Sequence, residues 1–96
     1  MNSTNEKNME LLINSILKIR NKQEATNYLL DILSNRELDT LVLRLEIAKM
    51  LHEGVPYIEI ERKMGASSAT IAKMNEALKY GHDGLRTILD RLKRVK

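Results

Sequence analysis

The sequence predicts an all-α protein, and three features support this prediction. Apolar residues recur at helical spacing along most of the chain, while no stretch has the pattern of a β-strand. Three Ser or Asn residues each precede a glutamate by three positions, a pattern typical of helix starts. The residues from Tyr57 to Gly81 have the pattern of a helix, a tight turn and a second helix. We therefore expect six helices in one domain that spans residues 1–96.

Capping boxes mark the starts of the first three expected helices. The pairs are Ser3 with Glu6, Asn21 with Glu24, and Ser34 with Glu37. In such a pair the first side chain accepts a hydrogen bond from the first turn of the helix, and the glutamate reaches back to the cap. Each cap contributes about 1 kcal/mol, so the boxes set the boundaries more sharply than periodicity does. The helices that they open are expected to end near Arg20, Leu33 and Glu53.

The first and third of these helices are apolar on more than one side. The apolar residues of the first are Met9, Leu11, Leu12, Ile13, Ile16, Leu17 and Ile19. The third has one side formed by Leu38, Leu41, Val42, Leu45 and Ala48 and another formed by Leu43, Ile47 and Met50. A chain of 96 residues offers too few further elements to cover two such helices. We expect an intertwined homodimer in which residues 1–53 form the dimerisation helices; a compact monomeric bundle is the alternative.

The helix-turn-helix is expected over residues 54–81, beginning where Gly54 ends the long helix. Gly65 can adopt the positive φ of the turn, and Ser67 can cap the second helix. Ile58, Ile60 and Met64 give the first short helix an apolar side, and Ile71, Met74 and Leu78 recur at i, i+3 and i+7 in the second, with Ile71 and Leu78 buried. The two helices are expected to pack through Ile60, Met64, Ala66, Ile71 and Met74. The face left outside consists of Ser67, Ser68, Ala69, Ala72 and Lys73. Such small side chains, with one cation among them, can enter the major groove of DNA without steric conflict.

Double-stranded DNA is the partner that this face predicts. The five outer residues are expected to face the bases, and the residues expected near phosphate are Arg62, Lys63, Thr70 and Lys79. Small contacting side chains favour readout through water and DNA shape. Because no Arg, Asn or Gln stands at the base-facing positions, a helical protein-interaction dimer without DNA binding is the alternative function.

The distribution of charge agrees with a polyanionic partner. The net charge is only +3, yet residues 1–61 carry seven basic and ten acidic side chains, and residues 62–96 carry nine and three. Basic charge therefore begins inside the helix-turn-helix and continues to the last residue. A solvated basic surface without a partner is the alternative interpretation.

After the motif, a turn over residues 81–84 is expected to lead into a C-terminal packing helix within residues 82–96. Gly81 is the expected helix stop and Asp83 the expected N-cap. The apolar side of this helix consists of Leu85, Ile88, Leu89, Leu92 and Val95. Its other sides are basic and carry Arg86, Arg91, Lys93 and Arg94.

Composition argues against an enzyme and against a membrane protein. The chain has no cysteine, and its two histidines stand thirty positions apart, so we expect no catalytic residues, no metal site and no cofactor. It also lacks Phe and Trp, which predicts an aliphatic core. The polar N-terminus has no apolar run long enough for a signal peptide or a membrane span. We expect a cytoplasmic protein.

The stretch from Ile32 to Tyr80 resembles the Trp repressor superfamily, and more closely its YerC/YecD-type branch of Trp repressor-like proteins. The matching residues are Leu33, Glu37, Leu41, Arg44, Ile47, Leu51 and Gly54, followed by Gly65-Ala66, Ala69-Thr70-Ile71 and Leu78-Lys79. The resemblance implies a six-helix intertwined homodimer that presents two helix-turn-helix units to a pseudo-palindromic operator and regulates transcription, as a repressor. In Trp repressor, a known example of this docking, the half-sites lie about 34–36 Å apart.

The resemblance also implies an effector pocket, in which Ser34, Arg44 and Thr70 match or replace ligand-holding residues of Trp repressor. Three positions differ, because Lys73 replaces an arginine, Ala77 a serine and Met74 a glycine. A methionine at this inward position would fill the volume that glycine leaves for an aromatic ligand. Lysine lacks the planar two-pronged contact that arginine offers a carboxylate. We therefore expect no response to tryptophan; whether another small molecule acts as effector stays open.

Overall fold

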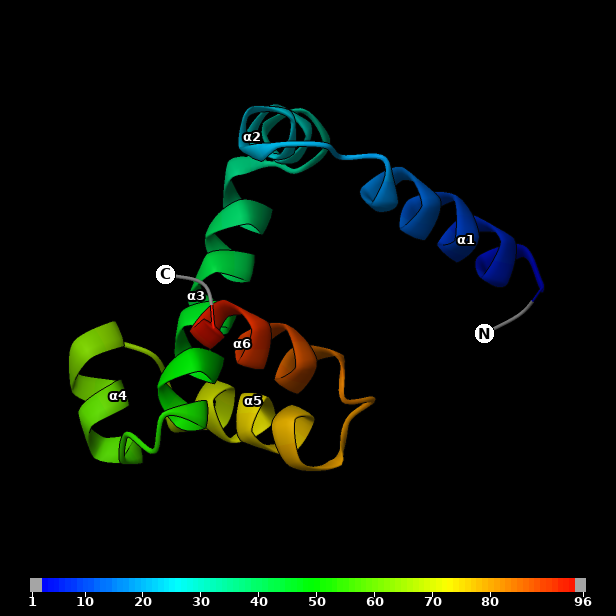
Figure 1. Ribbon diagram of the computed structural model, residues 1–96. Helices are drawn as coiled ribbons and strands as arrows, with labels where there is room; N and C mark the ends of the chain where they lie inside the picture. The colour runs from blue at the N-terminus through cyan, green and yellow to red at the C-terminus, as the bar shows by residue number, and fades with distance from the viewer. Residues whose placement is uncertain (1–2, 95–96) are drawn as a thin grey trace. The chain divides into compact units, whose positions relative to one another are not determined.

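The computed structural model describes the backbone of residues 3–94 and the side chains of residues 8–93, and this part of the chain contains six helices and no strand (Figure 1). The helices are α1 (Ser3–Leu17), α2 (Lys22–Ile32), α3 (Asn35–His52), α4 (Tyr57–Met64), α5 (Ser68–Tyr80) and α6 (Gly84–Arg94). All six predicted helices are confirmed. The largest difference between a predicted and an observed boundary is at the end of α1, which ends at Leu17 and was expected to reach Arg20. There the N–H groups of Lys18 and Ile19 donate to carbonyl groups three residues earlier, which tightens the last turn.

Two of the three predicted helix caps are confirmed, and the one at Ser34 forms the complete predicted box. The Asn21 side chain accepts from the Glu24 N–H at 2.9 Å, while the Glu24 carboxylate accepts from the Arg20 N–H at 3.0 Å. The second box is reciprocal, because the Ser34 Oγ accepts from the Glu37 N–H at 3.1 Å and the Glu37 carboxylate accepts from the Ser34 N–H at 2.8 Å. The box of Ser3 and Glu6 lies outside the described side chains.

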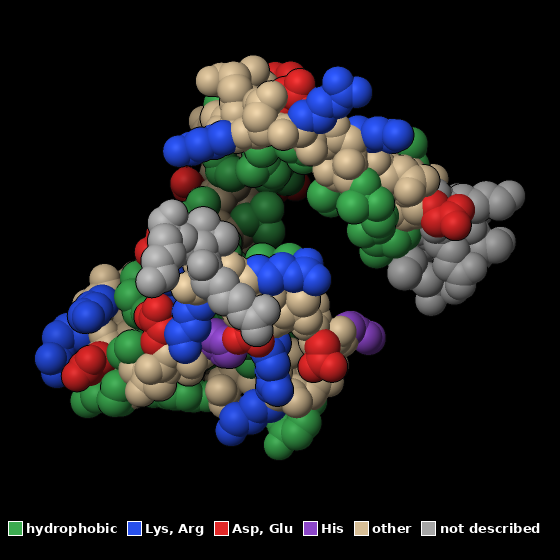
Figure 2. Space-filling view, viewed as in Figure 1, with side chains coloured by type: hydrophobic (Ala, Val, Ile, Leu, Met, Phe, Trp, Pro, Cys, Tyr) green, Lys and Arg blue, Asp and Glu red, His purple; other side chains and the backbone are tan. Residues whose placement is uncertain are grey.

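The chain divides into two compact units, Met1–Leu38 and Asp39–Lys96, with the boundary inside α3. In the first unit no described side chain is buried. A hydrogen bond of 2.5 Å between Ser15 Oγ and Tyr28 Oη joins α1 to α2. Large apolar side chains are exposed on both helices, and Figure 2 shows hydrophobic side chains along the visible face of α1. They are Met9, Leu11, Leu12, Ile13, Ile16, Leu17, Leu29, Leu30 and Ile32.

The second unit contains the core, in which α4, α5 and α6 gather around the C-terminal half of α3 (Figure 1). One cluster is formed by the fully buried Ile47, Ile60 and Ile71, and the other by Ala48, Leu78 and Leu89. Leu51 and Met74 pack against both clusters. The core is therefore aliphatic, as the composition predicts.

The structure corrects two predicted apolar sides. Ile58 was expected to share a side of α4 with Ile60, but it is 66% exposed, because residues two apart point to different sides of a helix. On α6, Leu85 and Leu89 pack against the core, whereas Ile88 and Leu92 are about half exposed. Val95 lies outside the described residues.

The turn between α5 and α6 begins at Gly81 and contains Asp83, as predicted. Gly81 has a negative φ, and a Cβ there would lie 2.3 Å from the Ala77 carbonyl oxygen, so the close approach of backbone requires glycine. Asp83 adopts a φ of 64°, and its carbonyl group accepts from the Thr87 N–H at 2.9 Å. The backbone carbonyl of Asp83 therefore accepts a hydrogen bond from the first turn of α6.

The Ser34–Glu37 box makes a prediction about pH. Hydrogen bonds from the Ser34 N–H and then the Ser34 hydroxyl favour the ionised carboxylate and hold the pKa of Glu37 below its ordinary value of 4.5. The depressed pKa means that this contribution to stability is present above pH 4.5 and is lost as pH falls through the folded pKa. We expect Ser34→Ala to raise the pKa of Glu37 toward its ordinary value, as measured by NMR titration of the carboxyl group. Asn21→Ala, which removes a different cap, serves as the control and should leave that pKa unchanged.

Candidate nucleic-acid interface

The helix-turn-helix is built from α4, α5 and a turn that glycine permits. Pro56 is the N-cap of α4, and its carbonyl accepts from the Ile60 N–H at 3.1 Å. Gly65 ends α4 with a φ of 64°, and its N–H donates to the Glu61 carbonyl at 2.9 Å. Ser67 then caps α5, because its Oγ accepts from the Thr70 N–H at 3.2 Å. The predicted roles of Gly65 and Ser67 are confirmed.

Packing against α3 fixes the two motif helices. Ile60 from α4 and Ile71 from α5 meet Ile47 from α3, and all three side chains are fully buried. Met64, Ala66 and Met74 pack around them, so the five residues predicted to join α4 to α5 lie in one cluster. The two helices are therefore held by a shared core as well as by the turn.

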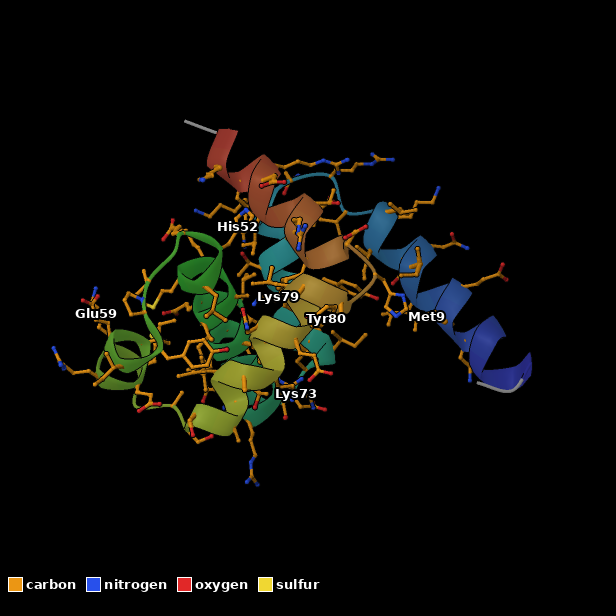
Figure 3. All side chains as sticks on the ribbon, turned by 90° about the horizontal axis from the view of Figure 1, so that it is seen from below. Met9, His52, Glu59, Lys73, Lys79 and Tyr80 are labelled. Carbon is orange, nitrogen blue, oxygen red and sulfur yellow. The ribbon has the colours of Figure 1, made fainter. Side chains whose placement is uncertain are left out.

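The predicted DNA-facing residues all lie on this motif. Ser67, Ser68, Ala69, Ala72 and Lys73 are exposed along α5 and its cap. Arg62 and Lys63 are exposed in the last turn of α4, and Lys79 is exposed near the end of α5; Figure 3 labels Lys73 and Lys79. Thr70 is half-buried, with its Oγ1 at 3.0 Å from the Ser67 Oγ. Thr70 thus contributes to the cap in addition to the phosphate contact expected of it.

The acidic residues of α4 would repel phosphate if they pointed toward bound DNA. In Figure 3 Glu59 lies on the side of α4 that faces away from α5. It also belongs to the first turn of α4, where a negative charge interacts favourably with the helix dipole. Its carboxylate is therefore directed away from the exposed residues of α5.

The residues of the predicted effector pocket are divided between the two units. Ser34 caps α3 in the first unit, while the others lie in the second unit on α3 and α5: Arg44, Thr70, Lys73, Met74 and Ala77. Met74 is half-buried and packs against both core clusters, in agreement with its predicted inward direction.

Lys73 and Ala77 line a shallow hollow of about 310 Å³ on α5 that sequence reasoning missed. The other lining residues are Glu76, Tyr80 and Gly81. Tyr80 is 81% exposed, which is unusual for a large aromatic ring, but its spacing in the sequence gave no sign of a hollow.

Two polar contacts of α6 were also not predicted from the sequence, because each joins residues on different helices. The Arg86 Nη2 donates to the Leu78 carbonyl, and the His52 Nε2 lies 2.7 Å from the Asp90 Oδ1. Among the described residues, no group of three or more His, Asp or Glu side chains could hold a metal ion. No described helix is long and apolar enough to cross a membrane.

Comparisons with known proteins agree with this geometry. The family described as Trp repressor protein matches residues 7–93. The uncharacterized protein YerC of Bacillus subtilis (strain 168) is 39% identical over 90 residues, which cover 94% of this chain and 86% of YerC.

Two solved structures are similar in fold. A TrpR-like protein from Eubacterium eligens ATCC 27750 has a TM-score of 0.84 and 37% identity, covering 94% of this chain and 93% of that one. The crystal structure of a candidate Trp repressor from Staphylococcus aureus has a TM-score of 0.83 and 34% identity, covering 91% and 87%.

The cap at the start of α5 yields a prediction about stability. Ser67→Ala removes the acceptor for the Thr70 N–H and should lower the free energy of unfolding by about 1 kcal/mol. Ser68→Ala, an equal change at the next exposed position, should alter it by less than about 0.5 kcal/mol. Urea unfolding of both variants at one chain concentration tests this difference. Equal losses in the two variants would contradict the role of the Ser67 cap.

Proposed function

The chain belongs to the Trp repressor family, and from this premise we propose that it is a sequence-specific DNA-binding regulator of transcription, acting as a repressor. The observation that carries the proposal is the outer face of α5. Its small side chains and Lys73 are exposed, while the opposite side of the same helix is anchored through the buried Ile71. A helix that is anchored on its inner side and carries small side chains on its outer side can enter the major groove of DNA.

The basic residues around this face would position the duplex. Arg62 and Lys63 end α4, and Lys79 lies in the last turn of α5. Contacts of such residues with phosphate set the register and orientation of a protein on DNA but do not read its sequence. Reading would fall to the small residues of α5 through bridging water and DNA shape.

We infer that the functional form is a homodimer bound to a pseudo-palindromic operator. The exposed apolar side chains of α1 support this inference. So do Leu41, Val42 and Leu45, which are 43–47% exposed on the side of α3 that does not carry Ile47. A second copy would cover these surfaces and would supply the second helix-turn-helix, about 34–36 Å away, as in Trp repressor.

Duplex DNA binding at rising salt concentration tests the proposed function. If basic residues displace counterions from phosphate, log K falls linearly with log salt concentration. Lys79→Ala should weaken binding to all sequences alike and should reduce the salt slope by about 1. Lys18→Ala removes an equal charge from an exposed position outside the motif and should leave the slope unchanged.

Sedimentation of the same samples tests the dimer, which should contain two chains of 11.1 kDa. A dimer whose weak DNA binding does not depend on salt would favour the alternative, a helical protein-interaction dimer. A monomer that does not bind duplex DNA would contradict the whole proposal.

We further propose that tryptophan is not the effector. Met74 fills the space between the two core clusters, and Lys73 replaces the arginine of Trp repressor. A ligand in this position would displace the half-buried Met74 side chain and cost the apolar contacts that it makes with both clusters.

Calorimetric titration with L-tryptophan should therefore show no saturable binding in the micromolar range, and added tryptophan should leave the affinity for DNA unchanged. A micromolar dissociation constant would contradict this prediction.

A further inference from the structure

The C-terminal end of α5 has a polar partner that comes from outside the helix. The last four carbonyl groups of an α-helix have no partner within it, and those of α5 belong to residues 77–80. The Ala77 carbonyl accepts from the Gly81 N–H at 3.0 Å. The Leu78 carbonyl accepts from the Arg86 Nη2 at 2.5 Å, in a partly buried position. Arg86 therefore satisfies one of the free carbonyl groups.

The chemistry of this contact suits a helix end. Arg86 carries a guanidinium cation, and a cation near a helix C-terminus interacts favourably with the helix dipole. Hydrogen bonds with a charged donor are stronger than neutral ones. The Leu78 side chain is itself buried against Ala48 and Leu89, so the carbonyl that Arg86 holds belongs to a residue fixed in the core.

Helix α6 is in turn attached to α3. Leu89 is buried against Ala48, and the Asp90 Oδ1 lies 2.7 Å from the His52 Nε2 at the end of α3. Asp90 follows Arg86 by four residues, so both side chains lie on the same side of α6. One side of α6 thus contacts the end of α5 and the end of α3.

We propose that α6 is a brace for the recognition helix and that Arg86 is a positioning residue for DNA binding. This inference rests on the proposed function. Arg86 bonds to the backbone at the end of α5 that is opposite to the Ser67 cap. By holding this end, it fixes the position of α5 against α3 without being part of the face that would enter the groove. Loss of the contact loosens the end of α5 and lowers DNA affinity.

The test compares Arg86→Met with Arg91→Met, which removes an exposed arginine from the same helix. In Arg86→Met we expect duplex affinity to fall about three- to tenfold at constant salt, since a hydrogen bond from a charged group is lost. Amide hydrogen exchange at residues 79–81 should become faster, while exchange in α2 should not change. The salt slope should stay that of the wild type, because no phosphate contact is removed. Arg86→Lys, which keeps the charge but not the planar donor, should give intermediate affinity and exchange.

Other outcomes distinguish the hypotheses. If Arg86→Met reduces the salt slope by about 1 and leaves exchange at residues 79–81 unchanged, Arg86 contacts phosphate and the positioning role is wrong. If Arg86→Met and Arg91→Met give equal affinity and equal exchange, the brace is wrong as well. If the wild type does not bind duplex DNA at any salt concentration, the proposed function fails, and with it the role of Arg86 in DNA binding. In that case the hydrogen-exchange measurement at residues 79–81 still tests whether Arg86 holds the end of α5. Circular dichroism of each variant verifies that the helices are intact.

Discussion

The contact of Ile47, Ile60 and Ile71 is the interaction on which the second unit depends. One side chain from each of α3, α4 and α5 is fully buried there, so the relative positions of three helices follow from a single aliphatic contact. Burial of side chains of this size contributes roughly 1.5–3 kcal/mol each. The contact also decides which side of α5 is left outside, because Ile71 sets the rotation of that helix. The exposed face proposed to meet DNA is a consequence of this burial.

Met74 and α6 complete the support behind α5. Met74 packs against both core clusters, so the flexible thioether side chain fills the space where the two meet. Arg86 holds the C-terminal end of α5, as Ser67 holds the N-terminal end. A helix that is fixed at both ends and along its inner side needs no ligand to position it. The proposal that tryptophan is not the effector and the proposal that α6 is a brace have this common physical basis.

The helices and the motif could be predicted to a large extent because their signals are local. The pairs Asn21 with Glu24 and Ser34 with Glu37 act within four residues, and Gly65 and Ser67 determine the turn where they stand. The periodicity of α5 likewise identified Ile71 and Leu78 as buried. The prediction that Ile58 shares the apolar side of α4 with Ile60 was wrong, because residues two apart point to different sides of a helix. The contact of His52 with Asp90 joins residues 38 positions apart and has no signature in the sequence.

The sequence by itself determined that six helices form, where most of them begin and which side of α5 carries small residues. These properties depend on hydrogen bonds and periodicities that span no more than a few turns of helix. Only the tertiary structure decided that Arg86 reaches the Leu78 carbonyl, that Met74 touches both clusters and that Tyr80 is exposed beside a hollow. Those contacts require the rotation and separation of whole helices. The packing of distant side chains fixes these quantities, and no local pattern contains them.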